Sequence, residues 1–216
     1  MSKNPHSLET EKVFTDIVIH RRGPGTWFGH TCGSGSRMEN TQNIREQLPA
    51  ALEHLGCTSM LDAPCGDYSW MSTITWPEDF GYIGADIVEQ MINTLKSQWP
   101  TVDFRHLDII HDPLPAADVM FCRDCLVHLP WADIKKVIEN VVASDIKYLA
   151  TTSFIHGDQE EITTGRHRPI NLQQAPSNFP EPVYAIEDQD APELGKHMMF
   201  WSKSQLIAAL EQWQQV

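Results

Sequence analysis

The sequence predicts an α/β fold with a doubly wound, mostly parallel sheet. Short apolar segments alternate with segments of helical period between residues 57 and 154. The apolar segments read as strands buried on both faces, which is typical of a parallel sheet covered by helices. The chain has 216 residues, of which 41% are hydrophobic and 21% charged, so it can bury a core of ordinary size.

The first part of the chain, residues 1–56, is expected to precede the sheet. Residues 8–19 form a short amphipathic segment, and residues 21–36 are rich in Gly, Pro and Ser and predict a loop. A helix is expected to begin near Asn40 or Thr41, because apolar residues then recur at helical spacing up to Gly56. Pro49 lies inside that pattern and indicates a kink or two shorter helices.

The middle of the chain contains the predicted sheet. The expected strands are 57–63, 81–87, 102–109, 116–124 and 146–154, and the expected helices are 88–100 and 132–144. In such a sheet, ligands bind at the carboxyl ends of the strands, near the point where the strand order reverses.

The last part of the chain departs from this alternation. Residues 155–181 hold many polar groups and predict a long loop, which is usually functional or mobile when it occurs in a compact domain. Residues 182–188 and 196–202 could pair as an antiparallel hairpin at one edge of the sheet. A closing helix is expected over 202–213, with Ser202 or Ser204 as its cap.

Charge and composition limit the classes of binding partner that the sequence predicts. Sixteen Lys and Arg against 29 Asp and Glu give a formal net charge of −13, which repels phosphate backbones and predicts no nucleic-acid partner. No stretch reads as a signal peptide or approaches the roughly 18 apolar residues of a membrane span, so we expect a cytoplasmic protein without a membrane partner. The five cysteines are scattered and odd in number, which indicates reduced thiols.

Three aspartates stand at the ends of three predicted strands: Asp62, Asp86 and Asp108. Gly66 follows the first of them, at a turn where backbone can approach a ligand without a side chain in the way. Asp86 comes 20 residues after Gly66, a position suited to accept hydrogen bonds from ribose hydroxyls. The three carboxylates are therefore expected to line one edge of the sheet.

Over residues 40–154 the sequence resembles the class I S-adenosylmethionine-dependent methyltransferases. "LDAPCGDYSW" looks like their first motif and "GYIGADI" like their second, while "FRHLDI" and "LPAADVMFCRDCLVHLP" look like their third and fourth. The resemblance implies a Rossmann-like methyltransferase fold and S-adenosylmethionine as cofactor. It also implies one methyltransferase domain over 1–216, with a cofactor-binding core at 57–154 and a substrate loop, hairpin and helix at 155–216.

The resemblance further implies which residues meet the cofactor. Backbone from Ala63 to Gly66 would pack against its methionyl part, Asp86 would hold the ribose, and Asp108 would meet the adenine amino group. Leu107 or Ile109 would pack on the ring. The cofactor-binding positions carried over are Asp62, Ala63, Pro64, Gly66, Asp86, Ile87, Leu107, Asp108, Ile109 and Arg123.

The first motif departs from the family pattern of three glycines. Pro64 and Tyr68 stand at two of those places, and only Gly66 remains. Pro64 can still form the turn because its φ is fixed. Tyr68 lacks the conformational freedom that a glycine would give there, so the following helix must start differently. The same changes weaken a dinucleotide reading, because a pyrophosphate would have poor access to backbone amides.

Further polar residues are candidates for binding and catalysis. Arg45 could grip the methionyl carboxylate, or it could be a solvated arginine on a helix face. Arg123, Asp124 and His128 follow the fourth strand, where acceptors of this family lie. Asp124 and His128 are four residues apart, so on a helical turn they would share a face.

His128 is suited to take a proton, although a structural histidine is the other reading. His156, in the loop after the fifth strand, is a second candidate base. That loop could close over the acceptor or simply be exposed. Trp27 and Trp70 could stack on the cofactor or fill the core. Cys122 and Cys125 lack a second ligand pair, so no metal site is expected.

The sequence thus predicts methyl transfer from S-adenosylmethionine to an O or N atom of a small molecule or glycan. Two alternatives stay open. One is a protein or peptide methyltransferase, whose acidic surface would recruit basic segments. The other is a non-catalytic module that binds S-adenosylmethionine. No stretch specifies the acceptor or the oligomeric state.

Overall fold

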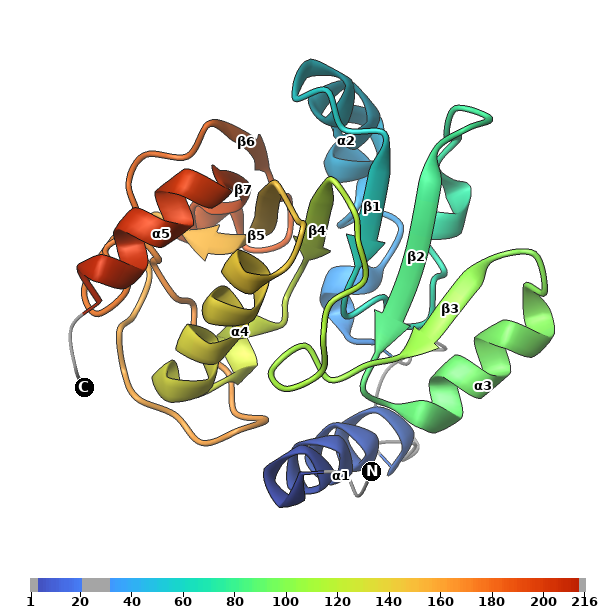
Figure 1. The fold of residues 1–216 in the computed structure, drawn as a ribbon, viewed down its shortest axis with the longest axis horizontal. Coiled ribbons are helices and arrows are strands. Elements are labelled where there is room, and N and C mark those ends of the chain that lie inside the picture. The colour runs from blue at the N-terminus through green and yellow to red at the C-terminus, as the bar shows by residue number, and fades with distance from the viewer. Residues whose placement is uncertain (1–3, 21–31, 214–216) are drawn as a thin grey trace.

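The computed structural model describes residues 4–20 and 32–213 and contains a seven-stranded sheet (Figure 1). The strand order is β3-β2-β1-β4-β5-β7-β6. The strands are β1 (Ser59–Asp62), β2 (Gly81–Asp86), β3 (Asp103–His106), β4 (Val119–Cys122), β5 (Tyr148–Phe154), β6 (Tyr184–Glu187) and β7 (Lys196–Ser202). Most of the predicted loop 21–36, including Trp27, lies outside the described residues.

The sheet has the predicted mixed character. Strands β1 to β5 pair in parallel, and β7 pairs antiparallel with both β5 and β6. The expected edge hairpin is therefore confirmed, and β7 lies between its partner β6 and the parallel strands. The strand order reverses between β1 and β4, which makes their carboxyl ends the switch point of the sheet.

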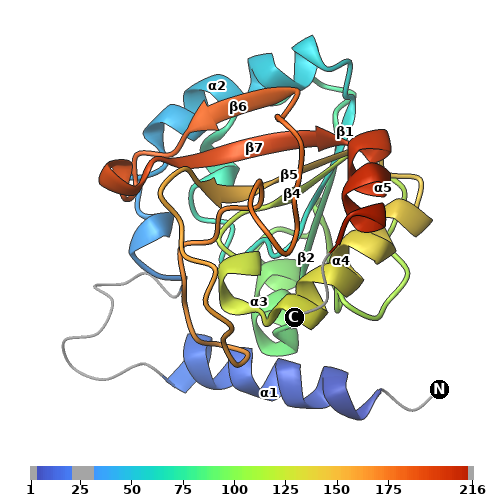
Figure 2. The same cartoon turned by 90° about the vertical axis from the view of Figure 1, so that its left-hand side faces the viewer.

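Helices cover both faces, because the central strands bury side chains on both sides. Leu61, Met120 and Leu149 belong to the core under α4 and α5, whereas Met60 and Phe121 belong to the core under α2 and α3. The helices are α1 (Pro5–His20), α2 (Gln42–His54), α3 (Glu89–Gln98), α4 (Trp131–Ala143) and α5 (Lys203–Glu211). Burying one such leucine or methionine contributes about 1.5–3 kcal/mol. Figure 2 shows α2 on one side of the sheet and α4 and α5 on the other.

Several boundaries differ from the predicted ones. Helix α2 is one helix with Pro49 inside it, because Leu48 and Leu52 are both buried and hold its two halves in the core. Strands β3 and β4 are shorter than predicted, since the buried residues that follow them lie in turns. The β1–β2 connection contains only a short 3-10 helix, η2 (Met71–Thr73), after Tyr68 at φ +60°.

Other predictions hold. Ser202 caps α5 in a reciprocal capping box: its hydroxyl accepts from the Gln205 backbone N–H, and the Gln205 side chain accepts from the Ser202 backbone N–H. Cys122 is fully buried in the core.

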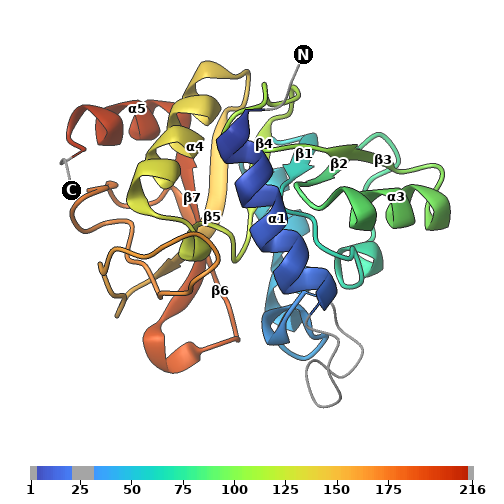
Figure 3. The same cartoon turned by 90° about the horizontal axis from the view of Figure 1, so that it is seen from below.

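Helix α1 lies across the carboxyl ends of the parallel strands (Figures 1 and 3). Two histidine–carboxylate contacts hold it there: His6 Nε2 lies 2.9 Å from Asp133 Oδ2 on α4, and His106 Nε2 lies 3.2 Å from Glu11 Oε1. Helix α1 thus roofs the edge of the sheet at which the predicted site lies. Across the described ranges, no helix has the length and apolarity needed to cross a membrane.

Candidate functional site

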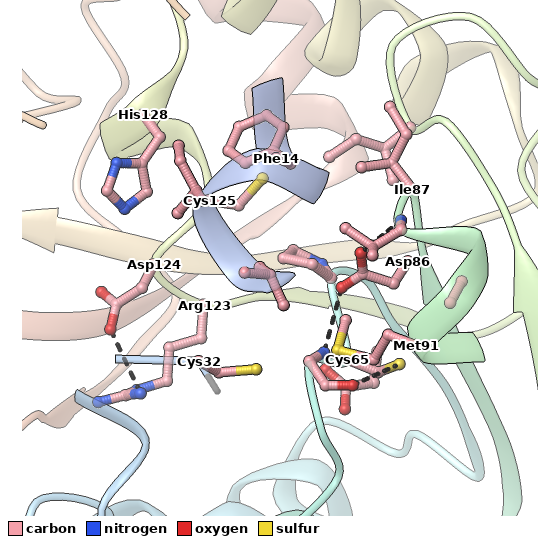
Figure 4. A pocket seen from close by; sticks show the side chains of 18 of the residues that line it. Phe14, Cys32, Cys65, Asp86, Ile87, Met91, Arg123, Asp124, Cys125 and His128 are labelled. Carbon is pink, nitrogen blue, oxygen red and sulfur yellow. Dashed lines mark hydrogen bonds and ion pairs between the residues drawn. The ribbon is translucent and has the colours of Figure 1, made fainter. Parts of the chain in front are cut away.

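A pocket lies between the carboxyl ends of the central strands and α1 (Figure 4). Its floor includes the strand-end aspartates Asp62, Asp86 and Asp108, and its roof includes Phe14 and Ile17 of α1. The three carboxylates that the sequence placed at one edge of the sheet therefore line a single pocket. Of the other predicted residues, Pro64, Gly66, Ile87, Leu107, Ile109, Arg123, Asp124 and His128 also line it.

The turn after β1 forms the floor. The backbone N–H of Ala63 donates to the Phe121 carbonyl at 2.9 Å, and that of Cys65 donates to the Ala85 carbonyl at 2.8 Å, which ties the turn to β4 and β2. Gly66 has φ +56°, and a Cβ there would lie 2.9 Å from Cys32 Sγ. Glycine is therefore required both by conformation and by the close approach of another segment.

Asp86 ends β2 and is 6% exposed. Its Oδ1 accepts from the Val88 N–H at 2.9 Å and its Oδ2 from the Gly66 N–H at 3.3 Å. Burial raises the pKa of Asp86 to about 6, although these two hydrogen bonds favour the ionised form. A carboxylate held rigidly at a pocket wall can accept hydrogen bonds from a vicinal diol.

Asp62 ends β1 and is 3% exposed. The Tyr82 hydroxyl donates to its Oδ2 at 2.7 Å. Burial, with a further contribution from the charge of Asp86, raises the pKa of Asp62 to about 8 despite that hydrogen bond. Asp62 is therefore largely protonated at neutral pH.

Asp108 shapes its own turn. Its Oδ1 accepts from the Ile110 N–H at 2.9 Å, and its Oδ2 lies 2.8 Å from His111 Nδ1. Leu107 and Ile109 are buried beside it. This wall of the pocket is apolar around one fixed carboxylate.

Arg123 and Asp124 belong to a charged cluster at the end of β4. The cluster consists of Arg123, Asp124, Asp188, Asp190 and Lys196. The Arg123 guanidinium donates to both oxygens of Asp188 at 2.9 and 3.1 Å and lies 3.3 Å from Asp124. Lys196 Nζ lies 2.9 Å from Asp124, 3.1 Å from Asp190 and 3.4 Å from Asp188. The cluster joins the edge hairpin to the pocket.

Asp124 presents the cluster to the pocket, with 29% of its side chain exposed. Burial opposes its charge, but Arg123 and Lys196 outweigh burial and hold the pKa of Asp124 well below its usual range. Asp124 has φ +52°, a conformation that a non-glycine residue rarely adopts. An ionised carboxylate, carried by a residue with a strained backbone, thus faces the pocket.

His128 lies at the end of the short 3-10 helix η3 (Leu126–His128), on the same side of the pocket as Asp124 (Figure 4). Its Nδ1 lies 2.9 Å from the Arg166 carbonyl. The two residues do not share one helical turn as predicted, because η3 begins after Asp124.

Three predicted residues do not line the pocket as the described residues form it. Arg45 turns back along its own helix, where Nη2 donates to the Met38 carbonyl at 2.9 Å and Nε to the Thr41 hydroxyl at 3.3 Å. His156 is exposed after β5. Ala63 is fully buried in the core. Trp70 is buried, lines the pocket and lies under the Arg123 guanidinium at 5.8 Å.

Sequence reasoning missed Asp188, Asp190 and Lys196. The signal in the sequence was a lysine that begins β7 and an aspartate that directly follows β6. Beside the roof, Glu89 joins Glu11 and His106, so that three potential metal-ligand atoms lie within 4.8 Å of one another. His106 Nε2 already contacts Glu11 at 3.2 Å and the Ile87 carbonyl at 3.0 Å.

Comparison with known proteins finds no family model and no curated protein that matches the sequence. Solved structures do match. The 1,6-didemethyltoxoflavin N1-methyltransferase of Burkholderia thailandensis, solved with S-adenosylhomocysteine, superposes at a TM-score of 0.56 and 15% identity, covering 93% of this chain and 90% of that one.

Two further structures show the same architecture. Magnesium protoporphyrin IX methyltransferase (ChlM) of Synechocystis PCC 6803, with bound S-adenosylmethionine, has a TM-score of 0.50 at 15% identity over 77% of this chain and 83% of its own. PigF, solved with S-adenosylhomocysteine, has a TM-score of 0.57 at 10% identity over 76% of this chain, which spans 56% of PigF. With its strand order and antiparallel edge pair, the chain has the class I methyltransferase fold.

Proposed function

We propose that this protein transfers a methyl group from S-adenosylmethionine to an O or N atom of a small molecule or glycan. The observation that carries the proposal is the pairing of Asp86 with the Gly66 N–H at the floor of a roofed pocket, in a chain with the class I methyltransferase fold. The solved neighbours bind S-adenosylmethionine or S-adenosylhomocysteine.

The donor set of the pocket fits this cofactor. The Gly66 turn brings backbone to the floor of the pocket, and Asp86 offers a buried carboxylate for two ribose hydroxyls. Leu107 and Ile109 provide an apolar wall for a purine ring, with Asp108 at its edge. Arg45 lies away from this wall, so Arg123 and Gly33, which line the pocket, are the groups proposed to meet the methionyl carboxylate.

When bound, the cofactor supplies an activated methyl group on a sulfonium, so the protein mainly aligns donor and acceptor. Alignment alone can lower the barrier by about 7–11 kcal/mol. Phe14 and Ile17 of α1 line the roof of the pocket and add apolar surface there.

The acceptor side favours an atom that carries a hydrogen. Asp124 is ionised there, so it attracts a hydroxyl or amine donor and repels an anionic acceptor such as a carboxylate. His128, on the same side, is the proposed base for a hydroxyl acceptor. His156 is exposed and does not line the pocket, which makes it the weaker candidate.

Methyl-labelled S-adenosylmethionine, incubated with the protein and fractionated cell lysate, tests the proposal. We expect label in small-molecule or glycan fractions and its loss with Asp86→Ala. Label confined to polypeptide would indicate the protein or peptide alternative. Cofactor binding without labelled product in any fraction would contradict catalysis and favour the non-catalytic module.

A further inference from the structure

A short segment of the long loop, residues 163–168, lies along the turn that carries His128. The Gly165 N–H donates to the His128 carbonyl at 2.9 Å, and the Arg168 N–H donates to the Val127 carbonyl at 3.1 Å. These backbone bonds join residues about 40 positions apart. The 163–168 segment is therefore docked on η3 in a fixed register.

The same register brings a backbone carbonyl to the imidazole of His128. His128 Nδ1 lies 2.9 Å from the Arg166 carbonyl oxygen. A carbonyl can only accept a hydrogen bond, so Nδ1 must carry the proton. In the neutral ring the basic lone pair then lies on Nε2, because the two nitrogens of imidazole share one proton.

Arg168 anchors the segment from its far end. The residue is 2% exposed, its guanidinium stacks on the Trp131 ring at 4.5 Å, and its Nη1 donates to the Leu129 carbonyl at 2.8 Å. Its Nε and Nη2 are buried without a hydrogen-bond partner among the described residues. Burying an arginine with two unsatisfied nitrogens costs free energy.

Gly165 fixes the segment against the roof of the pocket. It has φ +86°, and a Cβ there would lie 2.6 Å from Val13 Cγ1 and 2.9 Å from Ile17 Cδ1 of α1. The segment is thus held between α1 and η3, and Ile17 itself lines the pocket. Small movements of the carbonyl at Arg166 are therefore restricted on both sides.

We propose that the 163–168 segment selects the tautomer of His128, and that Arg168 is the positioning residue that holds the Arg166 carbonyl against Nδ1. The segment takes the role that a buried carboxylate plays toward histidine in hydrolase triads. The inference rests on the proposed function only in that Nε2 is the atom that would take a proton from a hydroxyl acceptor.

Long-range ¹H–¹⁵N correlation spectra of the histidine rings test this without cofactor or acceptor. His128→Asn identifies the His128 signals by their loss. At a pH high enough for the ring to be neutral, we expect the Nδ1-protonated form of His128. In Arg168→Ala we expect the Nε2-protonated form, which free imidazole side chains prefer in water, to become the major one.

Arg166→Ala is the matched control, because it removes an exposed arginine of the same segment and keeps the backbone carbonyl. It should leave the tautomer unchanged. Once an acceptor is known, turnover of Arg168→Ala should fall by up to the roughly 10²–10⁴-fold that a general base contributes, with unchanged cofactor affinity.

A wild-type His128 protonated on Nε2 would overturn the inference, and this result does not depend on whether Arg168→Ala folds. An Arg168→Ala protein that melts cooperatively and keeps the Nδ1-protonated form would also overturn it. Cofactor binding is measured separately. Failure of the proposed function and failure of the tautomer preference of His128 therefore give different results.

Discussion

The pocket has two sides, one at the ends of β1, β2 and β3 (the β1–β3 side) and one at the end of β4 (the β4 side). The contacts that hold them differ strongly in sequence separation. On the β1–β3 side, Asp86 bonds the backbone of residues 2 and 20 positions away, and Asp108 bonds the backbone of Ile110. On the β4 side, Arg123 pairs with Asp188 at a separation of 65 residues, and Lys196 pairs with Asp124 at 72. Local contacts of the first kind leave a motif in the sequence, and contacts of the second kind do not.

The two sides also differ in charge. Burial keeps Asp62 protonated at neutral pH, whereas Arg123 and Lys196 keep Asp124 ionised. The β1–β3 side thus resembles an ordinary buried wall with carboxyl groups. The β4 side depends on a buried charge network, in which each member needs the others.

The largest expected effect breaks the β4 side. Arg123 is buried, with 7% of the residue exposed. Asp188→Ala leaves its guanidinium without a bidentate partner. Removing one partner of a buried ion pair lowers the free energy of unfolding by about 3–5 kcal/mol. Urea unfolding measures this loss.

Glu187→Ala provides the control for that measurement, because Glu187 is the exposed residue directly before Asp188, at the end of β6. Its effect should stay within about 0.5 kcal/mol. Equal effects of the two substitutions would show that the cluster contributes nothing specific.

The second effect separates the charge states of the two sides. The unfolded chain releases the Asp62 proton near pH 4, whereas the native state retains it to about pH 8. Between these values the unfolded state binds fewer protons, so Asp62 makes stability fall as pH rises, by up to about 1.4 kcal/mol per pH unit. Asp62→Asn should remove this contribution, and urea unfolding at pH 5, 6 and 7 measures the slope.

In the same series, Asp103→Asn should keep the wild-type slope, because Asp103 is exposed on β3. If Asp62→Asn and wild type lose stability in parallel over this range, Asp62 is ionised in the native protein and the contrast with Asp124 is wrong.

The smallest effect tests the floor of the β1–β3 side. Gly66→Ala places a methyl group at φ +56°, 2.9 Å from Cys32 Sγ. The left-handed conformation alone costs an alanine about 1–2 kcal/mol. Gly56→Ala shares this cost, with φ +67°, but meets no atom within 4 Å. Thermal unfolding of both variants should show a larger loss for Gly66→Ala, and equal losses would remove the argument for close approach at the floor.

The strands of the sheet could be predicted from the sequence because buried parallel strands are apolar on both faces, as at Met60 and Leu61. The predicted β3 and β4 were too long, because Asp108 and Arg123 are as buried as strand residues while lying in turns. Burial pattern alone does not distinguish a strand from the turn that follows it.

The same distinction explains the site. The strand-end acids and Gly66 were found because each lies at or just after the end of a predicted strand. Arg45 was placed on the right helix, but periodicity does not show that its guanidinium bonds the Met38 carbonyl. Asp188 and Lys196 were missed because their partners Arg123 and Asp124 follow β4, 65 and 72 residues away along the chain.

Calorimetric titration with S-adenosylhomocysteine tests the central claim most directly. Two hydrogen bonds to a carboxylate, at about 1.5 kcal/mol each, predict that Asp86→Ala weakens binding by roughly 100-fold. Asp103→Ala, which removes an exposed aspartate from the neighbouring strand, should bind as wild type does. Wild-type affinity in Asp86→Ala would contradict the assignment of this pocket to the cofactor.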